Sequence, residues 1–328
     1  MRKVIVLTPV KNEAHFLHRF LSVTSNFADH IILADQNSSD ESCEIINTYP
    51  KAILINNQDF EIDNGKRQTL LINEARNRFG KENLLLALDV DEILSSNMLV
   101  SKEWRDAQNC PPGTVLYFEK PDLYNGTSQC IRYPKPWPLG FIDDGTEHTP
   151  TREHSIRIPT PTNHKPFIMS EIKVLHYALT RLDAQYSKVR LYSVRENLSG
   201  NWNILQRRRM YSQTRDYSNS GKLEPTKPEW FEVWEKLGID MHFVAKEEVY
   251  WYDYEVLKMI IQFGEKRFYW DDIWNYDWET LREKLASEGE KYLQKGKIKK
   301  PNIFQQTLMR IIDQIDQIIL KLKHVLKQ

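Results

Sequence analysis

This chain of 328 residues carries 45 basic and 45 acidic side chains, so its formal net charge is zero. Its 41% hydrophobic and 27% charged residues are typical of globular proteins and exclude wholesale disorder and collagen-like repeats. The charge balance argues against a nucleic-acid binder. Three scattered cysteines indicate a reducing compartment, and no segment approaches the ~20 apolar residues that cross a bilayer. We expect a cytoplasmic protein.

Short apolar runs alternate with amphipathic stretches over the first ninety residues. The runs comprise residues 4–7, 31–34, 52–55 and 84–88. Continuous runs of this length indicate strands that are buried on both faces, as in a parallel sheet. The stretches between them have helical spacing. We therefore expect right-handed βαβ units in an open α/β sheet, which binds its ligands at the carboxyl ends of the strands.

The rest of the chain changes character twice. Prolines cluster at residues 110–170, where we expect long loops, and such loops are commonly functional. The strands expected there are near residues 114–119, 155–158 and 173–177. From about residue 182 the pattern is helical. These changes predict a sheet domain at residues 1–180 and a helical extension at residues 181–328.

Two aspartates stand one residue apart at the end of the fourth predicted strand. The apolar run leads directly into Asp89, Asp91 and Glu92. Hard carboxylate oxygens suit Mg²⁺ or Mn²⁺, which bind one or two carboxylates together with substrate phosphates. A solvated acidic turn is the alternative for an isolated motif. Its position after a buried strand favours a metal site, because a charge there needs a partner.

Polar turns also follow the first two predicted strands. The first begins at Thr8 and Pro9 and ends at Glu13, and the second begins at Asp35. Both turns could serve only to start the next helix. Asp35, however, is placed where a carboxylate can accept hydrogen bonds from a base or a ribose.

Together these blocks resemble the family 2 glycosyltransferases of the GT-A fold. In that family a PxxNE turn follows strand one, an xDxxSxDxT-like turn follows strand two, and a DxD motif ends strand four. The corresponding blocks here are PVKNE at 9–13, DQNSSDES at 35–42 and DVDE at 89–92. NGKRQ at 64–68 resembles a further xxxRN block, with Gln68 replacing asparagine. The resemblance covers roughly residues 1–200.

The resemblance implies a GT-A (Rossmann-like), open, mostly parallel sheet flanked by helices, with a nucleotide-sugar donor at its carboxyl edge. Thr8, Pro9 and Glu13 would border the nucleoside. Asp35 would meet the base, and Arg67 would approach the base or the diphosphate. Residues 1–180 would then be the catalytic domain.

A divalent cation, Mn²⁺ or Mg²⁺, is also implied by the resemblance. Asp91 would ligate it, and Asp89 would lie near the ribose or the metal. Such a cation stabilises the departing nucleoside diphosphate. A histidine beyond the acceptor loops often adds a ligand in this fold, and His176 fits that position. A hydrogen-bonded core histidine is the alternative.

The catalytic base must lie within hydrogen-bond reach of the acceptor hydroxyl if the transfer inverts the anomeric centre. The loop at residues 141–148 carries suitable acids, and we prefer Glu147, then Asp144, with Glu153 behind. Turn capping is the alternative for each of them. Trp137, between two prolines, could stack on a sugar or pack within its loop.

An amphipathic helix is expected at residues 302–326. Its apolar stripe comprises Phe304, Leu308, Ile311, Ile312, Ile315, Ile319, Leu322 and Leu326. With its lysines, this helix could lie on an anionic membrane surface or pair with a partner helix. The glutamines on its polar face favour packing on its own domain.

The sequence thus predicts a metal-dependent glycosyltransferase. It would move a sugar from a nucleotide-sugar, first of all a UDP-sugar, to a hydroxyl on a glycan, a lipid-linked saccharide or a protein. A nucleotidyltransferase is one alternative, but it would need a glycine-rich phosphate loop, and residues 8–13 contain no glycine. The other alternative is an inactive glycosyltransferase-like binding module, which metal-dependent turnover would exclude.

Overall fold

The computed structural model describes residues 2–57, 63–149, 156–213, 215–287 and 297–325. The chain forms two compact units. The sheet unit contains Met1–Arg181 and Tyr217–Ala245, and the helical unit contains Leu182–Asp216 and Lys246–Gln328. The predicted boundary at 180/181 did not anticipate the return of residues 217–245 to the sheet unit. As a statement about domains that fold by themselves, that boundary stays a prediction.

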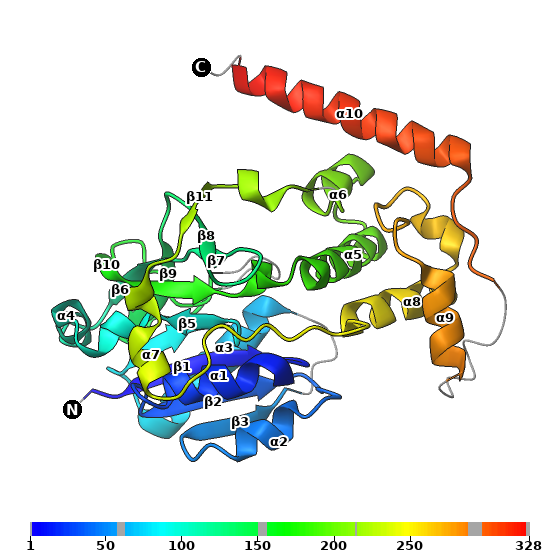
Figure 1. Cartoon of the computed structure of the whole chain (residues 1–328). Helices are drawn as coiled ribbons and strands as arrows, with labels where there is room; N and C mark the ends of the chain where they lie inside the picture. The colour runs from blue at the N-terminus through cyan, green and yellow to red at the C-terminus, as the bar shows by residue number, and fades with distance from the viewer. Residues whose placement is uncertain (1, 58–62, 150–155, 214, 288–296, 326–328) are drawn as a thin grey trace. The chain divides into compact units, whose positions relative to one another are not determined.

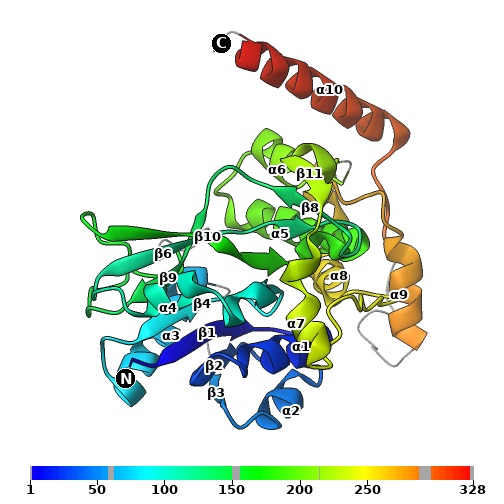
Figure 2. The same ribbon diagram turned by 60° about the vertical axis from the view of Figure 1, so that its left-hand side comes forward.

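One sheet of eleven strands dominates the described part of the sheet unit (Figures 1 and 2). The strands are β1 (Val4–Val10), β2 (His30–Asp35), β3 (Ala52–Asn56), β4 (Leu84–Ala87), β5 (Glu92–Leu94), β6 (Thr114–Glu119), β7 (Asp122–Leu123), β8 (Gln129–Arg132), β9 (Trp137–Ile142), β10 (Lys165–His176) and β11 (Lys222–Pro225). Their order is β11-β8-β7-β10-β6-β9-β4-β1-β2-β3, with β5 paired to β10.

The direction of the strands identifies the architecture. β3, β2, β1 and β4 are parallel, and β6 is parallel to β10. β9 runs antiparallel between β4 and β6. This arrangement confirms the predicted class: an open, mostly parallel, Rossmann-like α/β sheet of GT-A type flanked by helices.

Helices cover both faces of the parallel strands. In the sheet unit they are α1 (Ala14–Thr24), α2 (Ser42–Asn47), α3 (Asn64–Phe79), α4 (Lys102–Gln108) and α7 (Glu232–Lys236). Because side chains alternate along a strand, Val4 and Val6 pack with α1 and α2, whereas Ile5 and Leu7 pack with α3. Both faces of β1, β2 and β4 are buried apart from His30 at the start of β2, which explains their continuous apolar runs, whereas β3 is half-buried.

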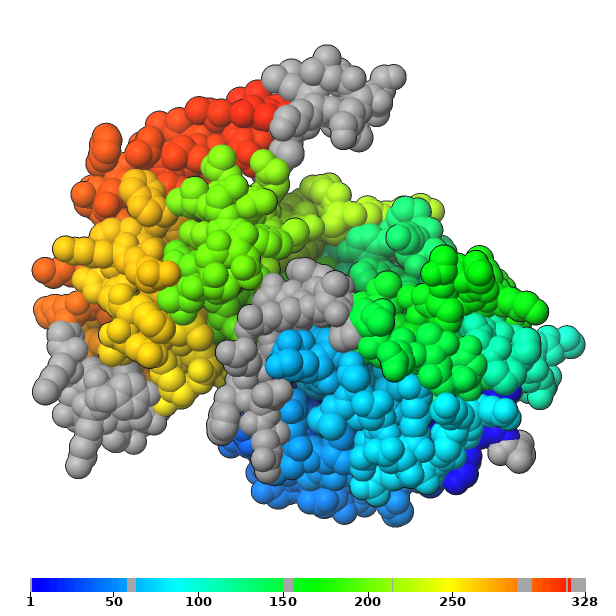
Figure 3. Space-filling view, turned by 180° about the vertical axis from the view of Figure 1, so that it is seen from behind, coloured from blue at the N-terminus to red at the C-terminus, as the bar shows by residue number. Residues whose placement is uncertain are grey.

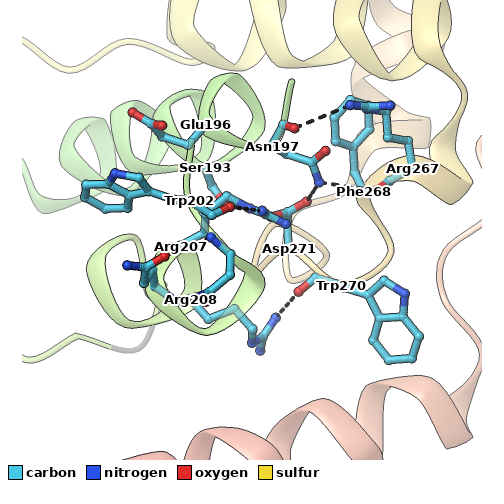
Figure 4. Close-up of polar contacts among 12 residues, drawn as sticks. Ser193, Glu196, Asn197, Trp202, Arg207, Arg208, Arg267, Phe268, Trp270 and Asp271 are labelled. Carbon is cyan, nitrogen blue, oxygen red and sulfur yellow. Dashed lines mark hydrogen bonds and ion pairs between the residues drawn. The ribbon is translucent and has the colours of Figure 1, made fainter. Parts of the chain in front are cut away.

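The helical unit contains α5 (Leu182–Ser199), α6 (Ile204–Met210), α8 (Trp251–Phe263), α9 (Trp278–Ser287) and α10 (Ile303–Val325). Its apolar core includes Val194, Leu257 and Trp278. Two buried arginine–aspartate pairs join its segments. Arg190 Nε lies 2.6 Å from Asp253 Oδ1. Arg207 Nε lies 2.7 Å from Asp271 Oδ1, and Figure 4 shows this second pair. Short 3₁₀ helices complete the two units: η1 (Ser96–Leu99), η2 (Ala178–Thr180), η3 (Tyr217–Asn219), η4 (Pro228–Trp230) and η5 (Glu265–Phe268).

One expectation from the sequence is wrong, and a second is met only in part. Residues 156–158 form no strand, because prolines follow and Arg157 instead turns to acidic partners; Ser155 lies outside the described residues. α10 does pack on its own unit, since its Asp313 and Asp316 bind Arg208 and Arg209 of α6. In its apolar stripe, however, Phe304, Ile311 and Ile315 are exposed.

Candidate active site at the carboxyl edge of the sheet

The carboxyl ends of β1, β2, β4 and β6 bring the predicted polar turns to one edge of the sheet. The turns after β1 and β2 contact each other, since Asn12 N donates to Ser38 Oγ at 2.9 Å and Ser39 N donates to Asn12 Oδ1 at 2.7 Å. Asn12 and Asn37 have positive φ angles of 54° and 53°. Asparagine tolerates this conformation better than most residues, so it allows the chain to turn sharply after each strand.

The acidic turn after β4 is held by its own backbone. Glu92 N donates to Asp89 O at 2.9 Å, and Asp89 N donates to Glu92 Oε2 at 3.0 Å. Tyr177 N donates to Asp91 O at 2.8 Å and ties the turn to the end of β10. Glu92 is fully buried, whereas the carboxylates of Asp89 and Asp91 remain partly exposed. The turn therefore exposes part of the Asp89 and Asp91 carboxylates, whereas the Glu92 carboxylate binds only groups within the protein.

Two cations compensate Glu92 and Asp89. Arg157 bonds both carboxylates, with Nη2 2.5 Å from Asp89 Oδ2 and Nη1 on Glu92 Oε2. Lys120 Nζ lies 2.8 Å from Glu92 Oε1. Burial by itself would raise the pKa of Glu92, but Arg157 and Lys120 hold that pKa well below its usual range. Burial raises the pKa of Asp89, with Arg157 and Arg67 acting in the opposite direction.

Asp91, His176 and Asp122 form a line across this edge. His176 Nε2 lies 3.4 Å from Asp91 Oδ2, and His176 Nδ1 lies 2.5 Å from Asp122 Oδ1. Burial and Lys120 would lower the pKa of His176, but the two aspartates raise it to about 9. Asp122 thus fixes the ring so that Nε2 points to the same place as the Asp91 carboxylate.

The donor set fits a divalent cation only in part. The described residues contain no group of three histidine, cysteine, aspartate or glutamate side chains that could hold a metal. Asp91 Oδ2 and His176 Nε2 nevertheless converge within 3.4 Å, with a carboxylate behind the imidazole. One carboxylate and one imidazole suit Mn²⁺ when substrate phosphates complete its coordination. Asp89 is engaged by Arg157 and does not join them.

The predicted nucleoside contacts lie on the neighbouring turns. Asp35 accepts hydrogen bonds from Ser38 N and Ser38 Oγ, at 3.1 and 2.5 Å. Arg67, in the first turn of α3, donates to Gln36 Oε1 at 3.2 Å, and its positive charge opposes the rise in the pKa of Asp89 that burial causes. Arg67 therefore links the turn after β2 to the acidic turn after β4.

Thr8, Pro9 and Glu13 follow the course of β1 to this edge. Thr8 and Pro9 are buried within the strand, and the Thr8 hydroxyl has no hydrogen-bond partner there. Glu13 begins α1, and its carboxylate lies 3.7 Å from His15 Nε2. Of these three residues, Glu13 is the one whose side chain is partly exposed.

The two preferred base candidates are separated by the structure. Leu84 pairs with Ile142 in antiparallel register, so β9 ends at the amino edge of the parallel strands. Asp144 follows there, accepts from Thr146 N at 2.8 Å, and does not lie with Asp91. Glu147 lies further along the loop, directly before His148. Glu153 lies outside the described residues.

The position of His148 relates Glu147 to the site. His148 Nδ1 is 2.9 Å from Thr69 Oγ1 near the start of α3, and His148 Nε2 is 2.7 Å from the carbonyl oxygen of Ile156. Ile156 directly precedes Arg157, which bonds the acidic turn. His148, directly after Glu147, therefore connects the start of α3 with the segment that leads into Arg157.

A cavity of about 900 Å³ adjoins the acidic turn. Arg157, His176 and Lys120 contribute charged groups to its lining, and Trp137, with 49% of its surface exposed, contributes an aromatic ring. The apolar part of the lining includes Tyr117, Pro136, Pro138, Leu139, Ile156 and Pro161. Lys120 Nζ lies 5.0 Å from the centroid of the Trp137 ring, a favourable cation–π distance. A lining that combines charged groups with an aromatic ring suits a polar ligand with a flat, apolar face.

Sequence reasoning missed three members of this site. Lys120 directly follows β6, a predicted strand, and Asp122 comes two residues later at the start of β7, so the same post-strand argument could have found them. Arg157 lies in a proline-rich loop, and nothing in its neighbourhood signals that it reaches the acidic turn.

Comparisons with known proteins add little to this geometry. No family model matches the chain, and no curated protein does so either. A solved structure described as a mycobacterial protein shares 14% identity, with a TM-score of 0.30, over 37% of this chain and 41% of its own. Glucosyl-3-phosphoglycerate synthase from Mycobacterium tuberculosis, crystallised with Mn²⁺, UDP and glucosyl-3-phosphoglycerate, shares 15% identity, with a TM-score of 0.28, over 38% and 44%.

A third solved structure, 4-diphosphocytidyl-2C-methyl-D-erythritol synthase, shares 12% identity, with a TM-score of 0.29, over 56% of this chain and 80% of its own. The matches to the first two structures span less than half of those chains. Identities and scores at this level carry no functional argument. The architecture rests on the order and direction of the strands themselves.

Proposed function

We propose that this chain is a metal-dependent glycosyltransferase that uses a nucleotide-sugar donor, first of all a UDP-sugar. The observation that carries the proposal is the convergence of Asp91 and His176 at the carboxyl edge, where Asp35 and Arg67 also lie. A doubly wound sheet binds its ligands at this edge. The large cavity beside the acidic turn supplies room for the sugar and its acceptor.

The chain's own groups would divide the work. Asp91 and His176 would hold Mn²⁺ or Mg²⁺, and Asp122 would orient His176. Bound there, the metal would neutralise charge on the diphosphate leaving group. Asp35 and the turn after β1 would bind the nucleoside, and Arg67 and Arg157 would contribute positive charge near the phosphates. Each of these roles places a group where the leaving group carries its charge.

The transfer breaks the bond between the anomeric carbon and the diphosphate oxygen and forms one to the acceptor oxygen. The acceptor proton must pass to a base, for which we retain Glu147 because His148, directly after it, contacts the start of α3 and the segment that leads into Arg157. Direct displacement of this kind inverts the anomeric centre. The acceptor would be a hydroxyl on a glycan, a lipid-linked saccharide or a protein, and a peripheral membrane contact would suit the second of these.

Ligand-induced stabilisation tests the proposal without knowledge of the acceptor. Thermal unfolding of the full chain is measured with UDP, with Mn²⁺, and with both together. A ligand at about 100 times its Kd stabilises the folded state by about 2.7 kcal/mol. We expect this stabilisation with UDP to depend on Mn²⁺ and to be lost in Asp91→Asn. Asp106→Asn, the same change in an exposed ion pair of α4, should retain it.

Equal stabilisation of Asp91→Asn and the unchanged protein would contradict the metal role. Products separate the two enzyme classes. A glycosyltransferase releases UDP from a UDP-sugar, whereas a nucleotidyltransferase consumes UTP and a sugar phosphate and releases pyrophosphate. Stabilisation by UDP with Mn²⁺ but no turnover on any UDP-sugar would favour a binding module.

A further inference from the structure

The apolar stripe of α10 faces away from the helix that holds α10 in place. Arg208 of α6 binds Asp313 through Nε–Oδ1 and Nη2–Oδ2 contacts of 2.7 and 2.5 Å. Arg209 binds Asp316 through contacts of 3.0 and 2.6 Å. Met309, one turn before Asp313, is buried on the same side. The side of α10 that carries both aspartates is therefore its inner side.

Helical geometry places the stripe on the outer side. Ile311 and Ile315 each lie two residues from Asp313. Two residues correspond to a rotation of about 200° around an α-helix, which is the opposite side. The exposed fractions agree: 46% for Ile311 and 51% for Ile315. Phe304, at the start of the stripe, is 76% exposed, and part of α10 is visible on the surface in Figure 3.

The charges around the stripe have one sign. Residues 297–325 contain two acids, Asp313 and Asp316, and both are bound to arginines on the inner side. Arg310 is exposed, and Lys297, Lys299 and Lys300 are exposed directly before the helix. The sequence adds Lys321 and Lys323 to its last turns. The apolar stripe is therefore accompanied by cations near it in the chain, while both acids of this segment are engaged on the inner side.

We propose that α10 lies flat on the surface of an anionic lipid bilayer, with its stripe in the headgroup region. An amphipathic helix with lysine or arginine beside its apolar face binds in this way. Among the described helices none is long and apolar enough to cross a membrane. The charges favour this partner over a second copy of the chain, because two copies joined by this stripe would bring cations together with no acids to pair them.

Vesicle flotation of the full chain tests the inference, which does not depend on the proposed reaction. We expect binding to phosphatidylcholine vesicles that contain phosphatidylglycerol and little binding to phosphatidylcholine alone. Replacing Lys297, Lys299 and Lys300 together by glutamine should weaken binding about tenfold or more, as should high salt.

Ile311→Asp with Ile315→Asp tests the stripe itself and should weaken binding at least about tenfold. Leu237→Asp is the matched control. Leu237 is also an exposed aliphatic residue, but it lies in the sheet unit, so this variant should bind as the unchanged protein does. Circular dichroism and thermal unfolding check that each variant is folded. Both isoleucines already face solvent, so the fold should survive.

Three results would overturn the inference. The first is an absence of binding to anionic vesicles. The second is equal binding by the Ile311→Asp, Ile315→Asp variant. The third is a dimer of the unchanged protein, in sedimentation velocity, that this variant converts to monomer, because the stripe would then be covered by a second copy.

Discussion

Oppositely charged side chains gather in both units, but in two different ways. In the helical unit Arg190 and Asp253 are almost fully buried, and Arg190 Nη1 has a further acceptor in Gln213 at 2.8 Å. Arg207 and Asp271 form a second such pair, to which Asn197 and Trp202 also contribute (Figure 4). These arginines are buried and are surrounded by hydrogen-bond acceptors.

At the carboxyl edge of the sheet unit the charges are spread over a turn and three other segments. Asp89, Asp91 and His176 keep part of their surface exposed, and His176 and Arg157 line a cavity. The comparison teaches that the kind of residue does not distinguish a structural cluster from a ligand site. Residual exposure beside a cavity does, because a ligand can then replace the existing contacts.

Removing one member of a buried pair should have the largest effect. Asp253→Ala leaves Arg190 buried without its carboxylate, and we expect the free energy of unfolding to fall by about 3–5 kcal/mol. Urea unfolding of the full chain, followed by tryptophan fluorescence, measures it. Asp106→Ala, in the exposed pair with Lys102, should cost less than about 1 kcal/mol. Similar losses in the two variants would break the distinction between structural and exposed pairs.

For the proposed base we expect a large loss of activity with little loss of stability. Glu147→Gln should lower kcat by about 10²-fold or more, because general-base catalysis contributes about 10²–10⁴-fold. Its stability should change little, since Glu147 is exposed. Asp144→Asn, at the amino edge, should retain activity. Turnover of a UDP-sugar with an accepted acceptor measures both, and a larger loss in Asp144→Asn would assign the base to the other acid.

The parallel strands could be predicted because burial on both faces leaves an unambiguous pattern. β1, β2 and β4 appear in the sequence as apolar runs, and the polar residues that follow them do meet at one edge. His176 was expected near Asp91 and lies 3.4 Å from it, although its role as a ligand stays a prediction.

There are two physical reasons why the sequence did not reveal the remaining contacts of the site. The rule that ligands bind after a strand applies to parallel strands only. β9 is antiparallel, so the residues after it, Asp143 and Asp144, lie at the amino edge, where Asp143 pairs with Arg76. Arg157 reaches Asp89 from 68 residues away, and the proline-rich sequence around it has no periodicity from which a long-range contact could be predicted.

A smaller effect on the free energy of unfolding is expected from a change of pH, and it should come from the site rather than from the buried arginine–aspartate pairs. Asp91 and Asp122 raise the pKa of His176 to about 9 from 6.5. The folded state therefore holds the proton more tightly, so this stabilisation is complete below about pH 6.5 and is lost as the pH rises toward about 9. We expect a loss of up to about 3 kcal/mol in the free energy of unfolding without metal. His176→Gln should flatten this decline, and an unchanged slope would contradict the assignment.

The smallest effect is expected on the aromatic wall of the cavity. If Trp137 stacks on a sugar, Trp137→Ala loses about 1 kcal/mol of binding, which raises KM about fivefold. Trp137→Phe should recover part of this loss, because it restores a ring face beside Lys120. Trp270→Ala, an exposed tryptophan of the helical unit, is the matched control and should leave KM unchanged. Since Trp137 is half exposed, its removal should cost little stability. A large fall in stability with no change in KM would instead show that Trp137 only packs within its loop, and the cavity would then resemble the buried clusters of the helical unit more than a ligand site.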